Sequence, residues 1–210
     1  MRNHPSEYPV ILWDFDGVIL DSMGVRDLGF EIVLKEYPND QLDELMKYHR
    51  ANGGLSRYVK FRYFFETIRG EKINDQQLNE LAQKFSEVML HELPNTDLII
   101  SKSLAFIQEQ HQKGKEQHIV SGSDQTELRI LCEKLTINHF FTTIQGSPTP
   151  KTELITGILA EQARPKDKFC LIGDSKNDYD AAQANGIDFF GFNNVKLVSL
   201  GKRYITRFDG

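Results

Sequence analysis

Short runs of apolar residues alternate along most of the chain with longer amphipathic stretches. The apolar runs are four or five residues long and are bounded by turn-forming residues, which predicts buried strands. Four runs are clear and one is weaker: residues 9–13, 117–120, 169–172 and 189–192, and then 140–144. Helical patterns cover residues 103–112, 125–135, 151–163 and 179–185, and the second begins with Asp124 and Glu127 at the spacing of a capping box. Strands that alternate with helices favour a parallel sheet with helices on both faces.

The segment of residues 22–93 does not follow this alternation. It contains no convincing strand and instead shows helical patterns at residues 26–36, 42–50, 57–68 and 76–90. The third of these is dense in aromatic residues, which is typical of the core of a helix bundle. We therefore expect an α/β core domain formed by residues 1–21 and 94–210, with an all-helical domain of residues 22–93 inserted after its first strand.

Composition and charge narrow the functional classes. The chain has 210 residues, of which 40% are hydrophobic and 26% charged, as in an ordinary globular protein. Its net charge is −5, so no overall basic field favours nucleic acid, and an anionic ligand needs a local site. No apolar run approaches the ~18 residues of a membrane-spanning helix. Cys132 and Cys170 form no C-x-x-C pair, which indicates buried thiols in a reducing compartment. We expect a cytoplasmic protein without a membrane segment, and its oligomeric state stays open.

Polar side chains follow four of the predicted strands. Asp14 and Asp16 come after the first, Ser121 after the second, Lys151 after the weaker one, and Asp174 after the run at 169–172. Each residue alone has a simpler interpretation as a helix cap, a turn former or a solvated helix start. The carboxyl ends of parallel strands, however, meet at one edge of a sheet, where ligands bind. Together these residues predict one polar site of three acids, a hydroxyl and an amine.

The motifs at these strand ends resemble those of the haloacid dehalogenase (HAD) superfamily. They are, in order, "DFDGV" at residues 14–18, "IVSG" at residues 119–122, Lys151, and "GDSKND" at residues 173–178. The third departs from the usual form, in which proline follows the lysine, because here Pro150 precedes it and Thr152 follows. The resemblance implies a Rossmann-like core with a helical cap, as in the branch of β-phosphoglucomutase and phosphoglycolate phosphatase. It implies a phosphatase that acts through an aspartyl-phosphate.

The resemblance also implies a role for each acid. Asp14 would attack phosphorus, and Asp16 would protonate the leaving oxygen, for which its pKa should be raised. Because a phosphate dianion repels carboxylates, a hard cation is needed, and Mg²⁺ is the expected cofactor. Its ligands would be the carboxylates of Asp14 and Asp174 and the backbone carbonyl of Asp16. Asp178 would orient waters or Lys151.

Further binding roles follow from the same resemblance. Ser121 and Lys151 would bind phosphoryl oxygens. Gly17 and Gly122 would allow the backbone to approach the substrate closely. The dehalogenase branch lacks an acid at the position of Asp16, so its presence points to phosphoryl transfer.

The inserted segment carries a possible substrate clamp. "GGLSRYVKF" at residues 53–61 resembles a G-x-S-R segment whose arginine grips a second anionic group of the substrate, which makes Ser56 and Arg57 candidates. The alternative for Arg57 is a solvated helix face, and both interpretations stay open. His49, Arg50 and Lys60 are further candidates nearby.

The expected substrate is a small phosphorylated metabolite, such as a sugar phosphate or a carboxylated phosphate ester. A phosphomutase of the β-phosphoglucomutase kind is an alternative. Arg26 stands where that mutase has a histidine, which disfavours this alternative. A non-catalytic HAD-like binding protein is the second alternative.

Overall fold

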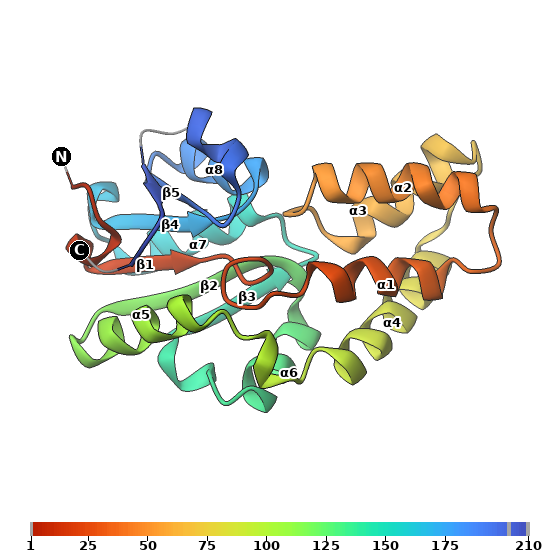
Figure 1. Cartoon of the computed structure of the whole chain (residues 1–210). Helices are drawn as coiled ribbons and strands as arrows, with labels where there is room; N and C mark the ends of the chain where they lie inside the picture. Colours follow the sequence, from red (N-terminus) through yellow and green to blue (C-terminus); the bar gives the residue numbers. More distant parts are fainter. Residues whose placement is uncertain (1, 201–202, 209–210) are drawn as a thin grey trace.

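A computed structural model describes residues 2–200 and 203–208 of the chain, and the outer limits of the predicted core domain, at residues 1 and 210, fall outside them. Its centre is one sheet of parallel strands in the order β3-β2-β1-β4-β5-β6 (Figure 1). The predicted α/β class is confirmed. The strands are β1 Val10–Trp13, β2 Glu116–Asp124, β3 Thr143–Ser147, β4 Phe169–Gly173, β5 Asp188–Phe192 and β6 Tyr204–Ile205.

Strand β1 lies in the middle of the sheet because it is apolar throughout. It pairs with β2 on one side and with β4 on the other, and all four of its side chains are buried. Val10 and Leu12 belong to one apolar cluster, and Ile11 and Trp13 to another. This alternation is the one expected for a parallel strand with helices packed on both faces.

Four helices cover the two faces of the sheet. Helices α5 (Ser101–Gln112) and α6 (Gln125–Lys134) share the apolar cluster of Trp13. Helices α7 (Lys151–Gln162) and α8 (Lys176–Asn185) share that of Leu12. Among the described residues, none of the helices is both long and apolar enough to span a membrane.

The observed elements differ from the predicted ones mainly at their ends. Strand β2 runs four residues further than expected, to Asp124, and so contains the serine of the second motif. The weak strand lies at residues 143–147 because residues 138–140 form a 3-10 turn. Helix α8 begins three residues early, because the Ser175 side chain accepts a hydrogen bond from the Asp178 N–H and Asp178 accepts from Ser175 in return.

The remaining α-helices form one group, which lies between β1 and α5 in the sequence. They are α1 (Met23–Val33), α2 (Asn39–Ala51), α3 (Arg57–Arg62), which continues into a π-helical segment at Tyr63–Ile68, and α4 (Asp75–Glu92). Figure 1 shows this group beyond one end of the sheet, and we call it the cap. The division into domains at residues 21/22 and 93/94 stays a prediction.

Aromatic side chains hold the cap together, as the sequence indicates. Phe30 of α1 lies with its ring centroid 5.3 Å from that of Phe61 on α3 and 4.6 Å from that of Phe85 on α4. Phe30, Phe61 and Phe85 are all buried. These rings therefore join the helices that carry the candidate substrate-binding residues.

We expect Phe61→Ala to lower the free energy of unfolding by about 3–5 kcal/mol, because it removes a fully buried ring at the centre of the cap. Val59 on the same helix is 42% exposed, and Val59→Ala should change stability by no more than about 0.5 kcal/mol. Urea unfolding of the two variants measures both. Equal losses would contradict this description of the cap core.

Candidate active site

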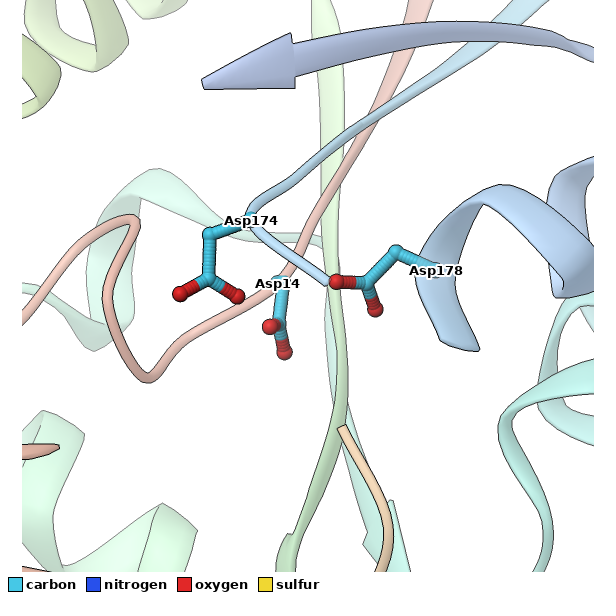
Figure 2. A group of neighbouring side chains, drawn as sticks. All are labelled: Asp14, Asp174 and Asp178. Atoms are coloured by element: carbon cyan, nitrogen blue, oxygen red, sulfur yellow. The ribbon is translucent and has the colours of Figure 1, made fainter. Parts of the chain in front are cut away.

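Three carboxylates meet at the carboxyl ends of the two central strands. Asp14 follows β1, Asp174 follows β4, and Asp178 lies in the first turn of α8. Each offers an oxygen, and these oxygens lie within 4.8 Å of one another (Figure 2). The structure thus brings together Asp14 and Asp174, which the sequence predicts as metal ligands, and Asp178, predicted beside them.

Local backbone contacts fix this arrangement. The N–H of Asp14 donates to the carbonyl of Ile172 (2.9 Å), so β1 remains paired with β4 up to the first acid. Gly17 has φ +74°, and a Cβ there would lie 2.1 Å from Oδ2 of Asp174. Only glycine allows this approach. In the structure, Gly17 therefore makes room for an acid of the site itself.

Lys151 bridges two of the acids. It is the first residue of α7, and its ammonium lies 2.8 Å from Oδ1 of Asp14 and donates to Oδ1 of Asp178. Asp178 is fully buried and also accepts hydrogen bonds from the N–H (3.0 Å) and hydroxyl (2.7 Å) of Ser175. The predicted proximity of Lys151 and Asp178 to Asp14 is therefore present in the structure.

Negative charge exceeds positive charge in this cluster, with three carboxylates facing one ammonium. Burial, followed by repulsion from Asp178, raises the pKa of Asp14 well above its ordinary value. Burial and repulsion from Asp14 do the same to the pKa of Asp174. Such a site stabilises an added cation, because a cation relieves the repulsion.

Asp16 lies in a different environment from the one that the sequence predicts. Its Oδ1 accepts from Ser22 (2.5 Å) and from Nε of Arg26 (3.0 Å), and its Oδ2 accepts from Ser123 (2.5 Å). Burial alone would raise the pKa of Asp16, but the Arg26 guanidinium and the two hydroxyls outweigh it and lower the pKa. The expectation of a raised pKa is therefore wrong for this arrangement, in which Asp16 is a carboxylate.

Arg26 belongs to a buried ionic network between cap and core. Its guanidinium donates to Oε1 of Glu127 (2.5 Å) and to Oγ of Ser123 (2.8 Å). Nη2 of Arg57 lies 2.6 Å from Oε2 of Glu127, in an ion pair that lacks hydrogen-bond geometry. The capping box expected from Asp124 and Glu127 is thus only half formed, because Asp124 caps α6 while the Glu127 carboxylate binds two cap arginines.

Arg57 is held by several contacts within the cap and to the core. Besides Glu127, it contacts the hydroxyl of Ser86 (2.6 Å) and the carbonyl of Ala82 (3.3 Å), and it lies over the ring of Phe85 (4.6 Å). It is 4% exposed, so the solvated alternative is wrong. Arg57 also lines the cavity between cap and core, and its role toward a substrate anion stays a prediction. Ser56 caps α3 by accepting from the N–H of Val59 (3.4 Å).

The second motif lies against the cap. Ser121 is buried, and its hydroxyl accepts from the N–H of Ser123 (3.1 Å). A Cβ at Gly122 would lie 2.5 Å from the carbonyl oxygen of Gly54 in the cap. The sequence predicts that the substrate approaches the backbone closely at Gly122. In the structure, the cap backbone at Gly54 lies at this position.

A cavity of about 30 Å³ lies between the cap and the strand ends. Asp14, Asp16 and Gly122 line it from the core, and the cap contributes Arg26, His49, Arg57 and Lys60 among others. This volume holds only one or two water molecules, so the structure shows a closed cap. Ser56 and Ser121 do not line this cavity.

A family model described as "Haloacid dehalogenase-like hydrolase" matches residues 11–192. The chain belongs to this family. The predicted family and enzyme class are thereby confirmed. A phosphoglycolate phosphatase of Aliivibrio fischeri is 23% identical over 203 residues, which cover 90% of this chain and 88% of that protein.

Solved structures share the fold over most of the chain. CbbY from Rhodobacter sphaeroides, in complex with xylulose-1,5-bisphosphate, has a TM-score of 0.76 at 14% identity and covers 96% of this chain and 95% of that one. A predicted phosphoglycolate phosphatase from Haemophilus somnus has the same TM-score and coverage at 15% identity. β-Phosphoglucomutase from Clostridium difficile has a TM-score of 0.76 at 12% identity, and the match covers 96% of this chain and 92% of that one.

Sequence reasoning on this HAD protein missed several residues of the site. Ser22, Ser123 and Glu127 hold Asp16 and Arg26, and Asn194 donates to the backbone carbonyl of Asp174 (2.7 Å). The second serine of "SGSD" was the available signal for Ser123, since it follows the motif serine by two positions in an extended strand. No local signal marks Glu127 as a partner of Arg26 and Arg57, which are distant from it in sequence.

His49 allows a test of burial beside the cavity. Burial, followed by the nearby charge of Lys60, lowers the pKa of His49 to about 3, so the imidazole is neutral in the folded protein. In the unfolded chain it takes up a proton below about pH 6.5. Because only the unfolded chain gains this proton, the free energy of unfolding is unaffected by His49 above about pH 6.5. It falls as the pH decreases, by about 2 kcal/mol at about pH 5.

We expect His49→Gln to lose less stability than the wild type between about pH 7 and about pH 5, because glutamine does not titrate. Urea unfolding at several pH values measures this difference in slope. Parallel curves for wild type and His49→Gln would show that His49 is not buried as described.

Proposed function

We propose that the protein is a Mg²⁺-dependent phosphatase that hydrolyses a small phosphorylated metabolite through an aspartyl-phosphate at Asp14. One observation carries the proposal. The carboxylate of Asp14, a residue that lines the cavity beneath the cap, lies 2.8 Å from the Lys151 ammonium and beside the carboxylate of Asp174. A nucleophile, a phosphate-binding cation and a metal-binding acid therefore share one place.

The chain's own residues fit a magnesium ion. The carboxylates of Asp14 and Asp174 supply the hard oxygen ligands that Mg²⁺ prefers, and their raised pKa values show that negative charge there is not compensated. We assign these two carboxylates and the backbone carbonyl of Asp16 as ligands. Asp178 positions Lys151, to which it is bound. When bound, Mg²⁺ would neutralise charge on the phosphoryl group and the nucleophile.

The protein residues account for both chemical steps. In the first, an oxygen of Asp14 bonds to phosphorus while the ester P–O bond breaks, and Asp16 gives the leaving oxygen its proton. In the second, Asp16 takes a proton from water, whose oxygen bonds to phosphorus and releases Asp14. Lys151 stabilises the phosphoryl oxygens in both. Because Arg26 holds Asp16 ionised while the cap is closed, we expect Asp16 to take up a proton from solvent when the cap opens to admit substrate, before the first step.

The relatives support a small phosphate ester as substrate. One carries the name of a phosphoglycolate phosphatase, and one solved structure contains xylulose-1,5-bisphosphate. Arg26 in place of the mutase histidine favours hydrolysis over isomerisation. We also assign the protein to the cytoplasm, since its two cysteines are free and buried, as suits a reducing compartment.

We expect Asp14→Asn to abolish phosphate release from p-nitrophenyl phosphate in the presence of Mg²⁺, because it removes the nucleophile and leaves the fold intact. Exposed Asp40 lies on α2, and Asp40→Asn should retain wild-type turnover. Colorimetric assays of the purified variants measure both. A rate for Asp14→Asn above roughly a thousandth of the wild-type rate would exclude Asp14 as nucleophile. Wild-type inactivity on a panel of phosphate esters would favour a binding protein instead.

Mg²⁺ should raise the melting temperature of the wild type, because it binds the folded state alone. At a Mg²⁺ concentration of about a hundred times Kd, the free energy of unfolding should rise by about 2.7 kcal/mol. Asp174→Asn should abolish this gain, while Asp40→Asn should keep it. Thermal unfolding with MgCl₂ or with EDTA gives the comparison. Stabilisation of Asp174→Asn as large as that of the wild type would refute the assigned ligand set.

A further inference from the structure

The cap half of the cavity contains more positive than negative charge. Arg26, Arg57 and Lys60 line it from α1 and α3. The carboxylates within contact distance of these cations are those of Asp16 and Glu127. Two carboxylates facing three cations leave one positive charge uncompensated among the described residues.

The uncompensated charge is that of Lys60. Its side chain is 4% exposed, and the one hydrogen bond of its ammonium within the described residues goes to the carbonyl of Gly53 (3.2 Å). An ammonium offers three donors, so two remain available at the cavity. Burial lowers the pKa of Lys60 to about 7, although Asp16 opposes this shift. A buried ammonium without a counter-ion is costly unless a ligand supplies one.

His49 is the second unsatisfied polar group of the same cavity. It is 2% exposed, and neither ring nitrogen makes a hydrogen bond to a described residue. Nε2 lies 3.2 Å from a carboxylate oxygen of Asp27, without hydrogen-bond geometry, and Nδ1 has no such neighbour. Buried polar atoms are satisfied by a partner in nearly all native structures, so a ligand or water belongs here.

We propose that Lys60, with His49 beside it, forms the subsite that selects the substrate by binding a carboxylate on its leaving group. The phosphoryl group lies at Asp14 and Lys151, and the carboxylate lies at the cap. A carboxylate matches the single uncompensated charge and a neutral imidazole that can donate one hydrogen bond. A second phosphate dianion would bring two negative charges against this single positive one, while the charge of Arg57 is paired with the Glu127 carboxylate. This inference rests on the proposed phosphatase, whose substrate class it names.

Matched pairs of phosphate esters test the subsite, because each pair differs by a carboxylate. The pairs are 3-phosphoglycerate and glycerol 3-phosphate, phosphoglycolate and ethyl phosphate, and 6-phosphogluconate and glucose 6-phosphate. For the pair that the wild type hydrolyses best, we expect kcat/KM to favour the carboxylated ester by about tenfold or more, the effect of one buried charged hydrogen bond. Lys60→Met should bring this ratio close to one, mainly through KM, and Lys60→Arg should restore part of it.

Two further variants sharpen the test. His49→Leu should lower the ratio by a smaller factor, about two- to tenfold, as expected for one neutral hydrogen bond. Lys47 is exposed on α2, and Lys47→Met should keep the wild-type ratio. If Lys60→Met and Lys47→Met gave the same ratio, Lys60 would not read the carboxylate.

Binding measurements separate this inference from the proposed function. Calorimetric titration of Asp14→Asn protein with both members of each pair, with Mg²⁺ present, gives the preference as a ratio of Kd without turnover. A tenfold tighter Kd for the carboxylated ester in at least one pair, lost when Lys60→Met is added, supports the subsite whatever the activity. Equal Kd values within every pair overturn it. Absence of hydrolysis despite that binding preference would overturn only the phosphatase.

Discussion

Mutual repulsion among buried carboxylates is the constraint on which the rest of the structure depends. Asp14, Asp174 and Asp178 are brought to within 4.8 Å of one another where β1 and β4 end, and Lys151 alone cannot balance them. Keeping this charge in the interior costs stability that the apolar faces of β1 must offset. An added cation would relieve this repulsion, and under the proposed function it would bring a phosphoryl group with it.

The distribution of charge divides the site into two halves of opposite net charge. The half at the strand ends carries excess negative charge, and the half formed by the cap carries excess positive charge. Between them, Asp16 and Glu127 bind Arg26 and so join cap to core when the cap is closed. Under the proposed function, a substrate that is anionic at both ends would complete both halves, with its phosphoryl group at the metal and its other end at Lys60.

The sequence predicted what depends on local pattern. The apolar runs defined the sheet, and the motif residues Asp14, Lys151 and Asp174 converge because parallel strands end at one edge. Contacts between residues that are distant in the sequence could not be predicted from such local patterns. Arg26 and Glu127 are separated by 101 positions, and the spacing of Glu127 from Asp124 indicated a capping box that the cap arginines prevent. The pKa of Asp16 depends on its contact with Arg26, which the sequence did not reveal. Arg26 lowers this pKa, whereas the sequence had predicted a raised one.

The account is tested most directly by a crystal structure of the protein with Mg²⁺ and trifluoroberyllate, which mimics a phosphoryl group bonded to an aspartate. We expect the beryllium to be bonded to a carboxylate oxygen of Asp14, with one Mg²⁺ contacting both Asp14 and Asp174, and with Lys151 bound to fluorine. Trifluoroberyllate bound elsewhere, or a Mg²⁺ that does not contact Asp174, would contradict the account.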